Sequence, residues 1–224
     1  MTAIESNIKA LRKEIPDNVK IVAVSKTKPV EDILSAYNSG HRIFGENRVP
    51  ELVSKCQALP VDIEWHFIGH LQTNKVRHLL PFVSVIQSVD SFRLLEVIDK
   101  ESARINRITD CLLQFHIAKE ETKSGFDEQE ALEMIHSAGF GQLRNVRICG
   151  VMGMATYTDD HNLVRDEFKK LRSLFDTIKS SGLVKARDFR EISMGMSGDY
   201  LVAVSEGATI VRIGSLIFGE RLNK

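Results

Sequence analysis

The chain alternates between short apolar runs and longer segments whose apolar residues recur at helical spacing. The first run, residues 19–24, is almost unbroken, as expected for a strand that is buried on both faces. It ends at Ser25-Lys26-Thr27-Lys28-Pro29. Residues 2–15, which precede it, have the pattern of an amphipathic helix, and we expect this helix to plug or flank the bottom of the fold.

Eight strand-like runs can be distinguished, at residues 19–24, 41–47, 63–69, 83–89, 110–118, 146–154, 189–194 and 208–214. Helical patterns directly follow seven of them, at residues 30–40, 48–58, 74–81, 91–106, 127–138, 161–181 and 199–206. Residues 119–125 are polar and predict a loop. This alternation predicts an α/β protein in which residues 1–224 form a single (β/α)8 TIM-barrel domain with an extra N-terminal helix.

Charge and composition limit the classes of partner. The chain has 30 basic and 30 acidic side chains and no net charge, without a run of five or six like charges. We therefore expect neither nucleic acid nor a membrane as a partner, although a local charged patch stays open. No stretch reaches the roughly 20 apolar residues that span a bilayer. The three cysteines, Cys56, Cys111 and Cys149, are far apart in the sequence, and we expect them to be reduced. The reduced cysteines and the lack of a membrane-spanning stretch together predict a cytoplasmic protein.

Lys26 follows the first strand, and in parallel barrels ligands gather at the carboxyl ends of the strands. Apolar strand residues and the nearby cation Lys28 should favour the neutral form of this amine, through desolvation and like-charge repulsion. A neutral amine can attack a carbonyl and form a Schiff base. The alternative is a solvated lysine at the end of a strand.

Two loops near the end of the chain are candidates for anion binding. Gly195 and Gly198 allow backbone N–H groups to approach an anion closely, and Ser197 adds a hydroxyl donor. Gly214 and Ser215 form a similar small pair after the eighth strand. Phosphate sites in such barrels are frequently built from the loops after strands seven and eight. The alternative is two ordinary turns that require glycine.

Arg212 interrupts an otherwise apolar strand, so it must find a partner or a ligand inside the barrel. A buried carboxylate such as Glu46 or Glu191 is one alternative partner. Asn47, at the end of the second strand, is a candidate to bond a ligand oxygen, and Met152 can pack against a flat ligand ring.

His66 and His70 are four residues apart, a spacing that suits two metal ligands on a helix. Residues 63–69 read as a strand, however, and no acidic third ligand is evident. We therefore expect no metal site.

Five motifs together resemble one family, and the match covers essentially the whole chain. They are Ala23-Val24-Ser25-Lys26-Thr27-Lys28, Phe44-Gly45-Glu46-Asn47, the segment 65–75, Ser193-Met194-Gly195-Met196-Ser197 and Val211-Arg212-Ile213-Gly214. In this order they resemble the pyridoxal phosphate homeostasis protein family. The resemblance implies a barrel like the N-terminal barrel of alanine racemase, with pyridoxal 5′-phosphate as the cofactor.

By the same analogy, Lys26 forms the internal aldimine, Ser197 and the backbone around Gly214 hold the phosphate, Arg212 lies by the pyridine nitrogen and Asn47 lies near the ring. The candidate cofactor-binding residues are therefore Lys26, Asn47, Met152, Ser193, Ser197, Arg212, Gly214 and Ser215. A permanent cation beside the pyridine nitrogen weakens the ring as an electron sink, so carbanion chemistry should be poor.

These expectations favour a monomeric carrier that holds the cofactor and releases it to apoenzymes that depend on pyridoxal phosphate. Two alternatives stay open: a racemase or β-elimination enzyme that acts on small amino acids, and a Schiff-base aldolase that acts on a sugar phosphate. A racemase of this fold also needs a tyrosine acid/base, and the nearest tyrosines in the sequence are Tyr157 and Tyr200.

Overall fold

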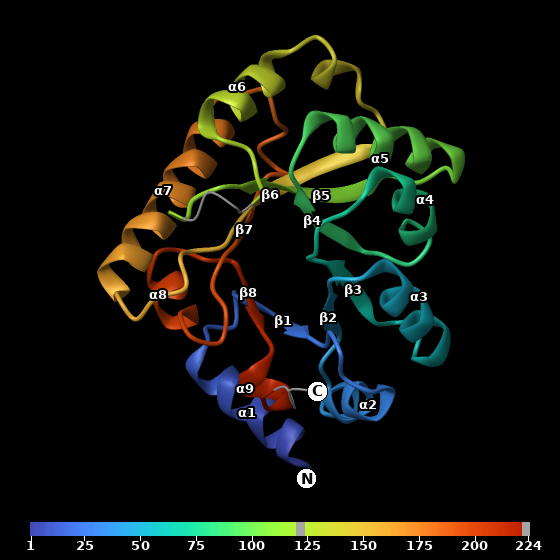
Figure 1. Cartoon of the computed structure of the whole chain (residues 1–224), viewed down its shortest axis with the longest axis vertical. Coiled ribbons are helices and arrows are strands. Elements are labelled where there is room, and N and C mark those ends of the chain that lie inside the picture. The colour runs from blue at the N-terminus through green and yellow to red at the C-terminus, as the bar shows by residue number, and fades with distance from the viewer. Residues whose placement is uncertain (120–123, 221–224) are drawn as a thin grey trace.

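Eight parallel strands close into a barrel in the order in which they occur in the chain, and helices surround it (Figure 1). The structure is a computed structural model that describes residues 1–119 and 124–220. The strands are β1 Lys20–Val24, β2 Ile43–Glu46, β3 Glu64–Phe67, β4 Val85–Val89, β5 Thr109–Phe115, β6 Val146–Gly153, β7 Glu191–Ser193 and β8 Ile210–Ile213. All eight predicted strands are present, and the predicted TIM barrel is confirmed.

Helices follow every strand and form the outer layer. They are α2 Val30–Asn38, α3 Val49–Ala58, α4 Val76–Leu79, α5 Phe92–Arg104, α6 Glu128–His136, α7 His161–Ser180, α8 Tyr200–Ser205 and α9 Ser215–Phe218, with 3-10 turns η1 Thr73–Lys75 and η2 Phe140–Gln142. The sequence did not predict α9, because four residues are too few to show a helical period. Part of the predicted loop 119–125, residues 120–123, lies outside the described residues.

The first helix, α1 (Ala3–Glu14), begins with a capping box in which Thr2 and Glu5 bond each other's backbone N–H groups. It packs against α2 and α9, and the Asn7 side chain donates to the carbonyl of Ile217 at 3.0 Å. Figure 1 shows it beside both helices in the outer ring. Of the two expected placements, plugging or flanking, the structure therefore excludes a plug, because α1 flanks the barrel from the outer ring. Because α9 is so short, α1 covers the wall that a longer eighth helix would cover.

Two apolar clusters result from the alternation of side chains along the strands. The larger lies between the barrel wall and the helices and includes the fully buried Phe44, Phe67, Phe168 and Phe189. The smaller fills part of the barrel interior and consists of Val22, Leu112, Met152 and Ile210. Ile43, Val85, Cys149 and Met154 pack against this cluster, and polar residues such as Arg212 occupy other interior positions, so the barrel is a packed core.

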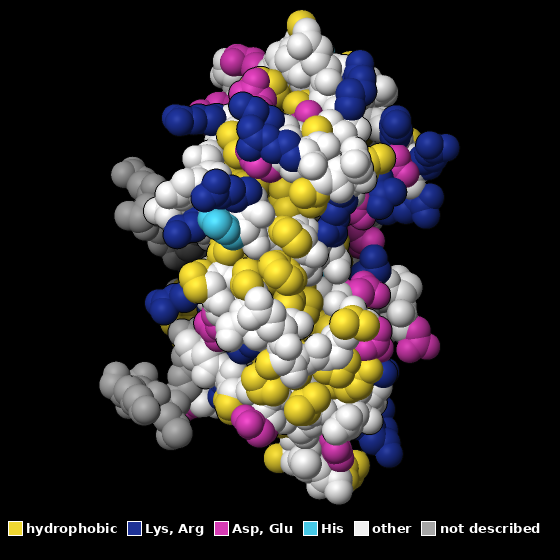
Figure 2. All heavy atoms as spheres, turned by 90° about the vertical axis from the view of Figure 1, so that its right-hand side faces the viewer, with side chains coloured by type: hydrophobic (Ala, Val, Ile, Leu, Met, Phe, Trp, Pro, Cys, Tyr) yellow, Lys and Arg dark blue, Asp and Glu magenta, His cyan; other side chains and the backbone are white. Residues whose placement is uncertain are grey.

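The face covered by α3, α4 and α5 has a local basic patch although the chain has no net charge. Figure 2 shows lysine and arginine side chains concentrated in the upper half of this face, over α4 and α5, with apolar side chains in its middle and lower parts. The exposed basic residues of these two helices are Arg77, Arg93, Lys100 and Arg104. Within residues 1–119 and 124–220, no helix is long and apolar enough to cross a membrane.

Truncation of one core side chain tests this packing. Phe168 of α7 is completely buried between the helix and the barrel, so Phe168→Ala should lower the free energy of unfolding by about 3–5 kcal/mol. The control Val61→Ala removes a fully exposed side chain and should change it by less than about 0.5 kcal/mol. Urea unfolding measures both, and equal values would contradict the assigned core.

Candidate functional site

Lys26 follows β1 at the carboxyl end of the barrel, as the sequence predicted. The ladder between β1 and β2 extends one residue past β1, because the Ser25 amide donates to the carbonyl of Gly45 at 3.0 Å. Lys26 is half-buried, and Thr27 directly after it adopts a left-handed backbone conformation with φ of 66°. Non-glycine residues rarely adopt this conformation, so the turn that presents Lys26 is a specific one.

The two predicted anion-binding loops meet beside the end of β1. The Gly214 amide donates to the Ser197 hydroxyl oxygen at 3.3 Å, and the Arg212 amide donates to the carbonyl of Gly195 at 2.9 Å. A Cβ atom on Gly214 would lie 3.5 Å from Val24, the last residue of β1. The ends of β7, β8 and β1 therefore adjoin one another, so the candidate anion site and Lys26 share one part of the rim.

Backbone donors at this rim are available to a ligand. The N–H groups of Ser197, Gly198, Ser215 and Leu216 donate to no acceptor in the described part of the chain. A Cβ atom on Gly198 would meet nothing within 4 Å, so this backbone can be approached closely. Unpaired amides on small residues suit a phosphate, whose oxygens accept hydrogen bonds.

Asp199, which the sequence analysis left without a role, closes the first of these loops. Its carboxylate accepts the Met196 amide at 2.5 Å, and Gly195 takes the left-handed conformation (φ 91°) that the tight turn requires. Burial raises the pKa of Asp199, while the Met196 bond and the charge of Arg212 oppose this rise. The sequence shows an aspartate directly before a helix, but its carboxylate bonds the preceding turn and does not cap the helix.

Arg212 lies inside the barrel with 4 % of its surface exposed. Its guanidinium donates to the Ser193 hydroxyl at 2.7 Å and to the carbonyl of Gly153 at 2.9 Å. Burial lowers its pKa to about 10, so it stays charged at neutral pH. The alternative pairing with Glu46 or Glu191 was wrong.

Those two carboxylates have other cations as partners. Glu46 bonds Lys55, and Glu191 bonds Lys20. Arg212 therefore forms no ion pair with either of them, although the charge of Asp199 acts on it, and it uses only two of its five N–H groups in the bonds described above.

A chain of hydrogen bonds runs from Arg212 through the barrel. The Ser193 hydroxyl donates to the Gln87 side-chain carbonyl at 2.6 Å, and the Gln87 amide donates to His66 Nδ1 at 2.7 Å. Burial lowers the pKa of His66 to about 3, so this histidine is neutral and carries its proton on Nε2. Ser193, a predicted cofactor-binding residue, thus holds Arg212 in place, and the sequence analysis missed Gln87.

The other candidates are spread around the barrel. Asn47 is partly exposed after β2, and Gly69 passes so close to it that a Cβ on Gly69 would lie 2.2 Å from the Asn47 carbonyl oxygen. Met152 is fully buried in the inner apolar cluster, and Ser215 is exposed at the start of α9. His70 bonds Asp90 at 3.1 Å, away from His66, so the two histidines share no ligand position.

A cavity of about 390 Å³ opens at the opposite, amino end of the barrel. Lys20, His66 and Glu191 are among its lining residues, so the hydrogen-bonded chain from Arg212 ends at this cavity. It lies at the far end of β1 from Lys26. Charged pairs such as Lys20 with Glu191 and Arg147 with Asp110 neutralise much of its wall.

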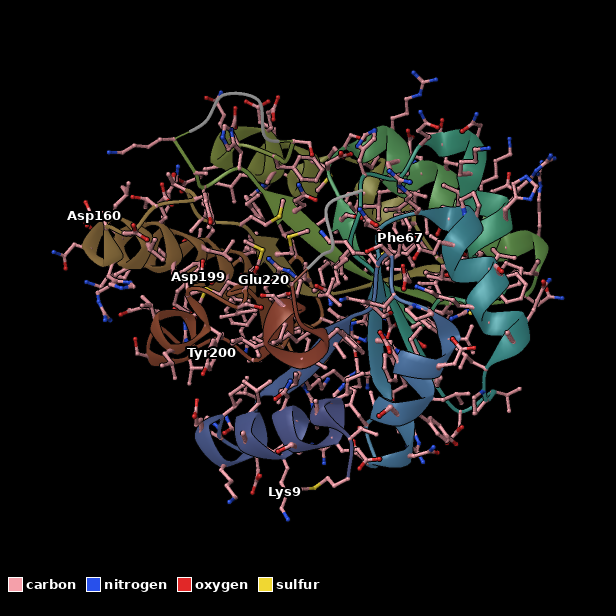
Figure 3. The ribbon with its side chains drawn as sticks, turned by 60° about the horizontal axis from the view of Figure 1, so that its bottom comes forward. Lys9, Phe67, Asp160, Asp199, Tyr200 and Glu220 are labelled. Carbon is pink, nitrogen blue, oxygen red and sulfur yellow. The ribbon has the colours of Figure 1, made fainter. Side chains whose placement is uncertain are left out.

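The two tyrosines considered as acid/base groups lie in different settings. Tyr200 points from α8 toward α1 (Figure 3), where its hydroxyl donates to Glu14 at 2.6 Å. Burial and this carboxylate raise its pKa to about 12. Tyr157 is 96 % exposed in the loop after β6. Tyr200 is therefore engaged in holding α1 to the barrel wall.

The donor set at the rim fits a ligand that combines an anion with a carbonyl. The amides of the β7 and β8 loops suit the anion, Lys26 supplies an amine, and Arg212 provides a buried cation that uses two of its N–H groups in bonds to the described residues. A metal is a poorer match, because no group of three His, Cys, Asp or Glu side chains in residues 1–119 and 124–220 is arranged to hold one.

Comparison with known proteins finds extensive similarity. Residues 1–222 match the family model described as alanine racemase, N-terminal domain. A pyridoxal phosphate homeostasis protein of Aquifex aeolicus is 42 % identical over 203 residues, which cover 90 % of this chain and 87 % of that protein. PipY of Synechococcus elongatus, solved with PLP bound, is 34 % identical with a TM-score of 0.87, covering 96 % of this chain and all of PipY.

Alanine racemase itself is a more distant relative. The enzyme of Clostridium difficile is 13 % identical with a TM-score of 0.81, covering 99 % of this chain and 61 % of the racemase. At this identity the likeness concerns the fold of the barrel alone.

Replacing Gln87 tests the hydrogen-bonded chain inside the barrel. Gln87→Leu leaves the Ser193 hydroxyl and His66 Nδ1 without their partner in a buried place, so the free energy of unfolding should fall by about 1–3 kcal/mol. The control Gln129→Leu changes an exposed glutamine of α6 and should be nearly neutral. Denaturant titration compares them, and an unchanged stability in Gln87→Leu would contradict the network.

The buried His66 also predicts a pH dependence. Its pKa is about 3 in the folded protein and 6.5 unfolded, so below pH 6.5 the unfolded chain binds a proton that the folded protein does not. Stability should therefore fall as the pH drops through this window, with a contribution of about 1.4 kcal/mol per pH unit from this group. When the free energy of unfolding is measured with urea between pH 7 and pH 5, it should depend less steeply on pH in His66→Asn than in wild type. An identical slope in both proteins would refute the assignment.

Proposed function

This chain belongs to the alanine racemase N-terminal domain family and, within it, to the pyridoxal phosphate homeostasis proteins. On that premise we propose that it binds pyridoxal 5′-phosphate at the rim of its barrel and takes part in the homeostasis of this cofactor. The observation that supports this best is the meeting of the ends of β1, β7 and β8, which brings the Lys26 segment next to the unpaired amides of the candidate anion site. PipY, a relative over its whole length, was solved with PLP bound.

Each side chain has a proposed role that follows from its position. Ser197 and the backbone from Gly214 to Leu216 hold the phosphate, and Arg212 lies at the pyridine nitrogen with Ser193 fixing its guanidinium. Asn47 is the proposed polar contact for the ring. Met152, the second contact proposed from the sequence, is fully buried in the inner apolar cluster, so a ring that reaches it must displace neighbouring side chains.

When bound, pyridoxal phosphate supplies an aldehyde carbon that condenses with a neutral amine and loses its oxygen as water. Lys26 is the amine in our proposal, and it lies half-buried at the rim. The Arg212 guanidinium donates hydrogen bonds and cannot accept one, so it disfavours a proton on the ring nitrogen beside it. The chain's own residues thus favour holding the cofactor over stabilising a carbanion, which supports a carrier.

Release of the cofactor follows from the same chemistry, since an incoming amine can take the place of Lys26. We propose apoenzymes that use pyridoxal phosphate as recipients, and a monomer as the carrier. A racemase would need a second acid/base near Lys26, and Tyr200 is held by Glu14 on the α1 side of the barrel wall.

Covalent attachment at Lys26 is the direct test. Wild-type protein mixed with pyridoxal phosphate should show the visible absorption band of a lysine-linked cofactor. Reduction of this mixture with borohydride should abolish the band and leave one reduced cofactor, joined by a C–N single bond, on the peptide that contains Lys26, as measured by mass spectrometry. Lys26→Ala removes the amine and should lose both signals completely, while phosphate contacts retain weaker binding.

Lys9→Ala is the matched control, because Lys9 is exposed and points away from the barrel on the outer side of α1 (Figure 3). It should label like wild type. The proposal fails if saturating cofactor leaves wild type unlabelled, or if Lys26→Ala is labelled to the same extent.

A further inference from the structure

The two peptide groups on either side of Lys26 are both held from helix α3. On the N-terminal side, the carbonyl of Ser25 accepts a hydrogen bond from the Lys55 ammonium at 2.8 Å. On the C-terminal side, the Thr27 amide donates to the Glu51 carboxylate at 2.7 Å. Glu51 and Lys55 are four residues apart on α3 and are themselves paired at 2.7 Å. One ion pair therefore fixes the backbone on both sides of the proposed reactive lysine.

The Lys55 ammonium is fully used in this arrangement. Its three N–H groups have three acceptors, which are the Ser25 carbonyl, Glu51 and Glu46. Lys55 is only 6 % exposed, although lysine is rarely buried without a specific partner. A buried ion pair often adds little stability, so stability alone does not explain why Lys55 is buried here.

Glu46 anchors the pair to the barrel wall. It is completely buried, and its Oε1 accepts both Lys55 at 2.7 Å and the Ser25 hydroxyl at 2.6 Å. Its Oε2 is buried without a hydrogen-bond partner among the described residues. Burial of such an atom is costly, so the cluster is retained at the expense of an unsatisfied polar atom.

The conformation of Thr27 shows what the cluster holds in place. Its φ of 66° is a left-handed conformation, which is unfavourable for a β-branched residue and persists only when its surroundings enforce it. The Glu51 bond to the Thr27 amide is the interaction that enforces it from α3. Ser25 is bonded by Glu46 and Lys55, while Lys26 begins the turn that follows β1.

We propose that the Glu51–Lys55 pair is the positioning device of Lys26, which holds the lysine backbone in the left-handed turn from which its amine reaches the cofactor aldehyde. The proposal rests on the function proposed above. Lys26 has a long, flexible side chain, so a fixed backbone removes part of the entropy cost of attachment and sets the direction of the amine. Glu51 and Lys55 act through Lys26, and neither is proposed to touch the cofactor.

Two variants of Glu51 separate positioning from packing and from charge. Glu51→Gln keeps an acceptor oxygen for the Thr27 amide, whereas Glu51→Leu keeps the bulk and removes the acceptor. We expect the equilibrium constant for attachment of pyridoxal phosphate, measured from the visible band, to fall about tenfold to a hundredfold in Glu51→Leu and to stay within about threefold of wild type in Glu51→Gln. A pure packing role predicts that Leu is tolerated, and a pure charge role predicts that both variants fail.

Binding of a second ligand shows whether the site is still intact, because a loss of structure would weaken that binding as well. Pyridoxine 5′-phosphate has an alcohol in place of the aldehyde, so it fits the same site without attachment to Lys26. Its Kd, measured by calorimetry, should change less than about threefold in Glu51→Leu. The matched control Glu31→Leu alters an exposed acid in the first turn of α2 and should change neither quantity.

The double variant Thr27→Gly/Glu51→Leu covers the case in which Glu51→Leu does not fold. Glycine adopts the left-handed conformation without strain, so attachment should recover at least in part. The inference is overturned if a Glu51→Leu protein that binds pyridoxine 5′-phosphate also attaches pyridoxal phosphate like wild type, or if the folded double variant shows no recovery. Failure of wild type to attach pyridoxal phosphate would instead refute the proposed function.

Discussion

A guanidinium enclosed by a closed barrel has to be solvated by the barrel's own polar groups, and this constraint explains the polar interior of the protein. Arg212 is charged and almost completely buried, so each group around it must accept or relay a hydrogen bond. Ser193 accepts from it on β7 and Gly153 on β6. Gln87 accepts a hydrogen bond from Ser193 and donates one to the neutral His66. The inner apolar cluster fills the positions that this network leaves over.

The two sides of β1 serve different purposes at its carboxyl end. Toward the helices, Ser25 is tied to Glu46 and Lys55 in a buried and highly connected cluster. Lys26, on the other side, is half-buried at the rim near the loops of β7 and β8. Rigid support on the α3 side fixes the backbone beside Lys26, the proposed attachment point, without requiring contacts from the ligand side.

The alternation of apolar runs and helical patterns was enough to predict the barrel, since every predicted strand is present in the closed sheet. The loops after β7 and β8, which the sequence analysis offered as anion-binding candidates from their residue types, meet through the Ser197–Gly214 bond. Interactions between distant residues could not be predicted in this way. Gln87 is a polar residue in an apolar strand, the same signal that drew attention to Arg212, yet only the fold shows that Ser193 connects them.

The partner of each buried charge was the other feature beyond reach of the sequence. Glu46 was a reasonable partner for Arg212, because both interrupt apolar strands, but the strands alternate so that the two side chains lie on opposite sides of the barrel wall. Glu46 faces α3 and pairs with Lys55, while Arg212 stays inside without a hydrogen-bonded carboxylate among the described residues.

This segregation of charges has a chemical consequence for the proposed site. No carboxylate among the described residues bonds the guanidinium, and Asp199, whose charge acts on Arg212 without a hydrogen bond, accepts the Met196 amide. Arg212 therefore stays a cation that can only donate hydrogen bonds to a group that lies against it. A pyridine nitrogen in that position stays unprotonated, and the ring then withdraws electrons poorly from a bound amine. The feature that makes the interior costly to build thus also favours storage of the cofactor over turnover.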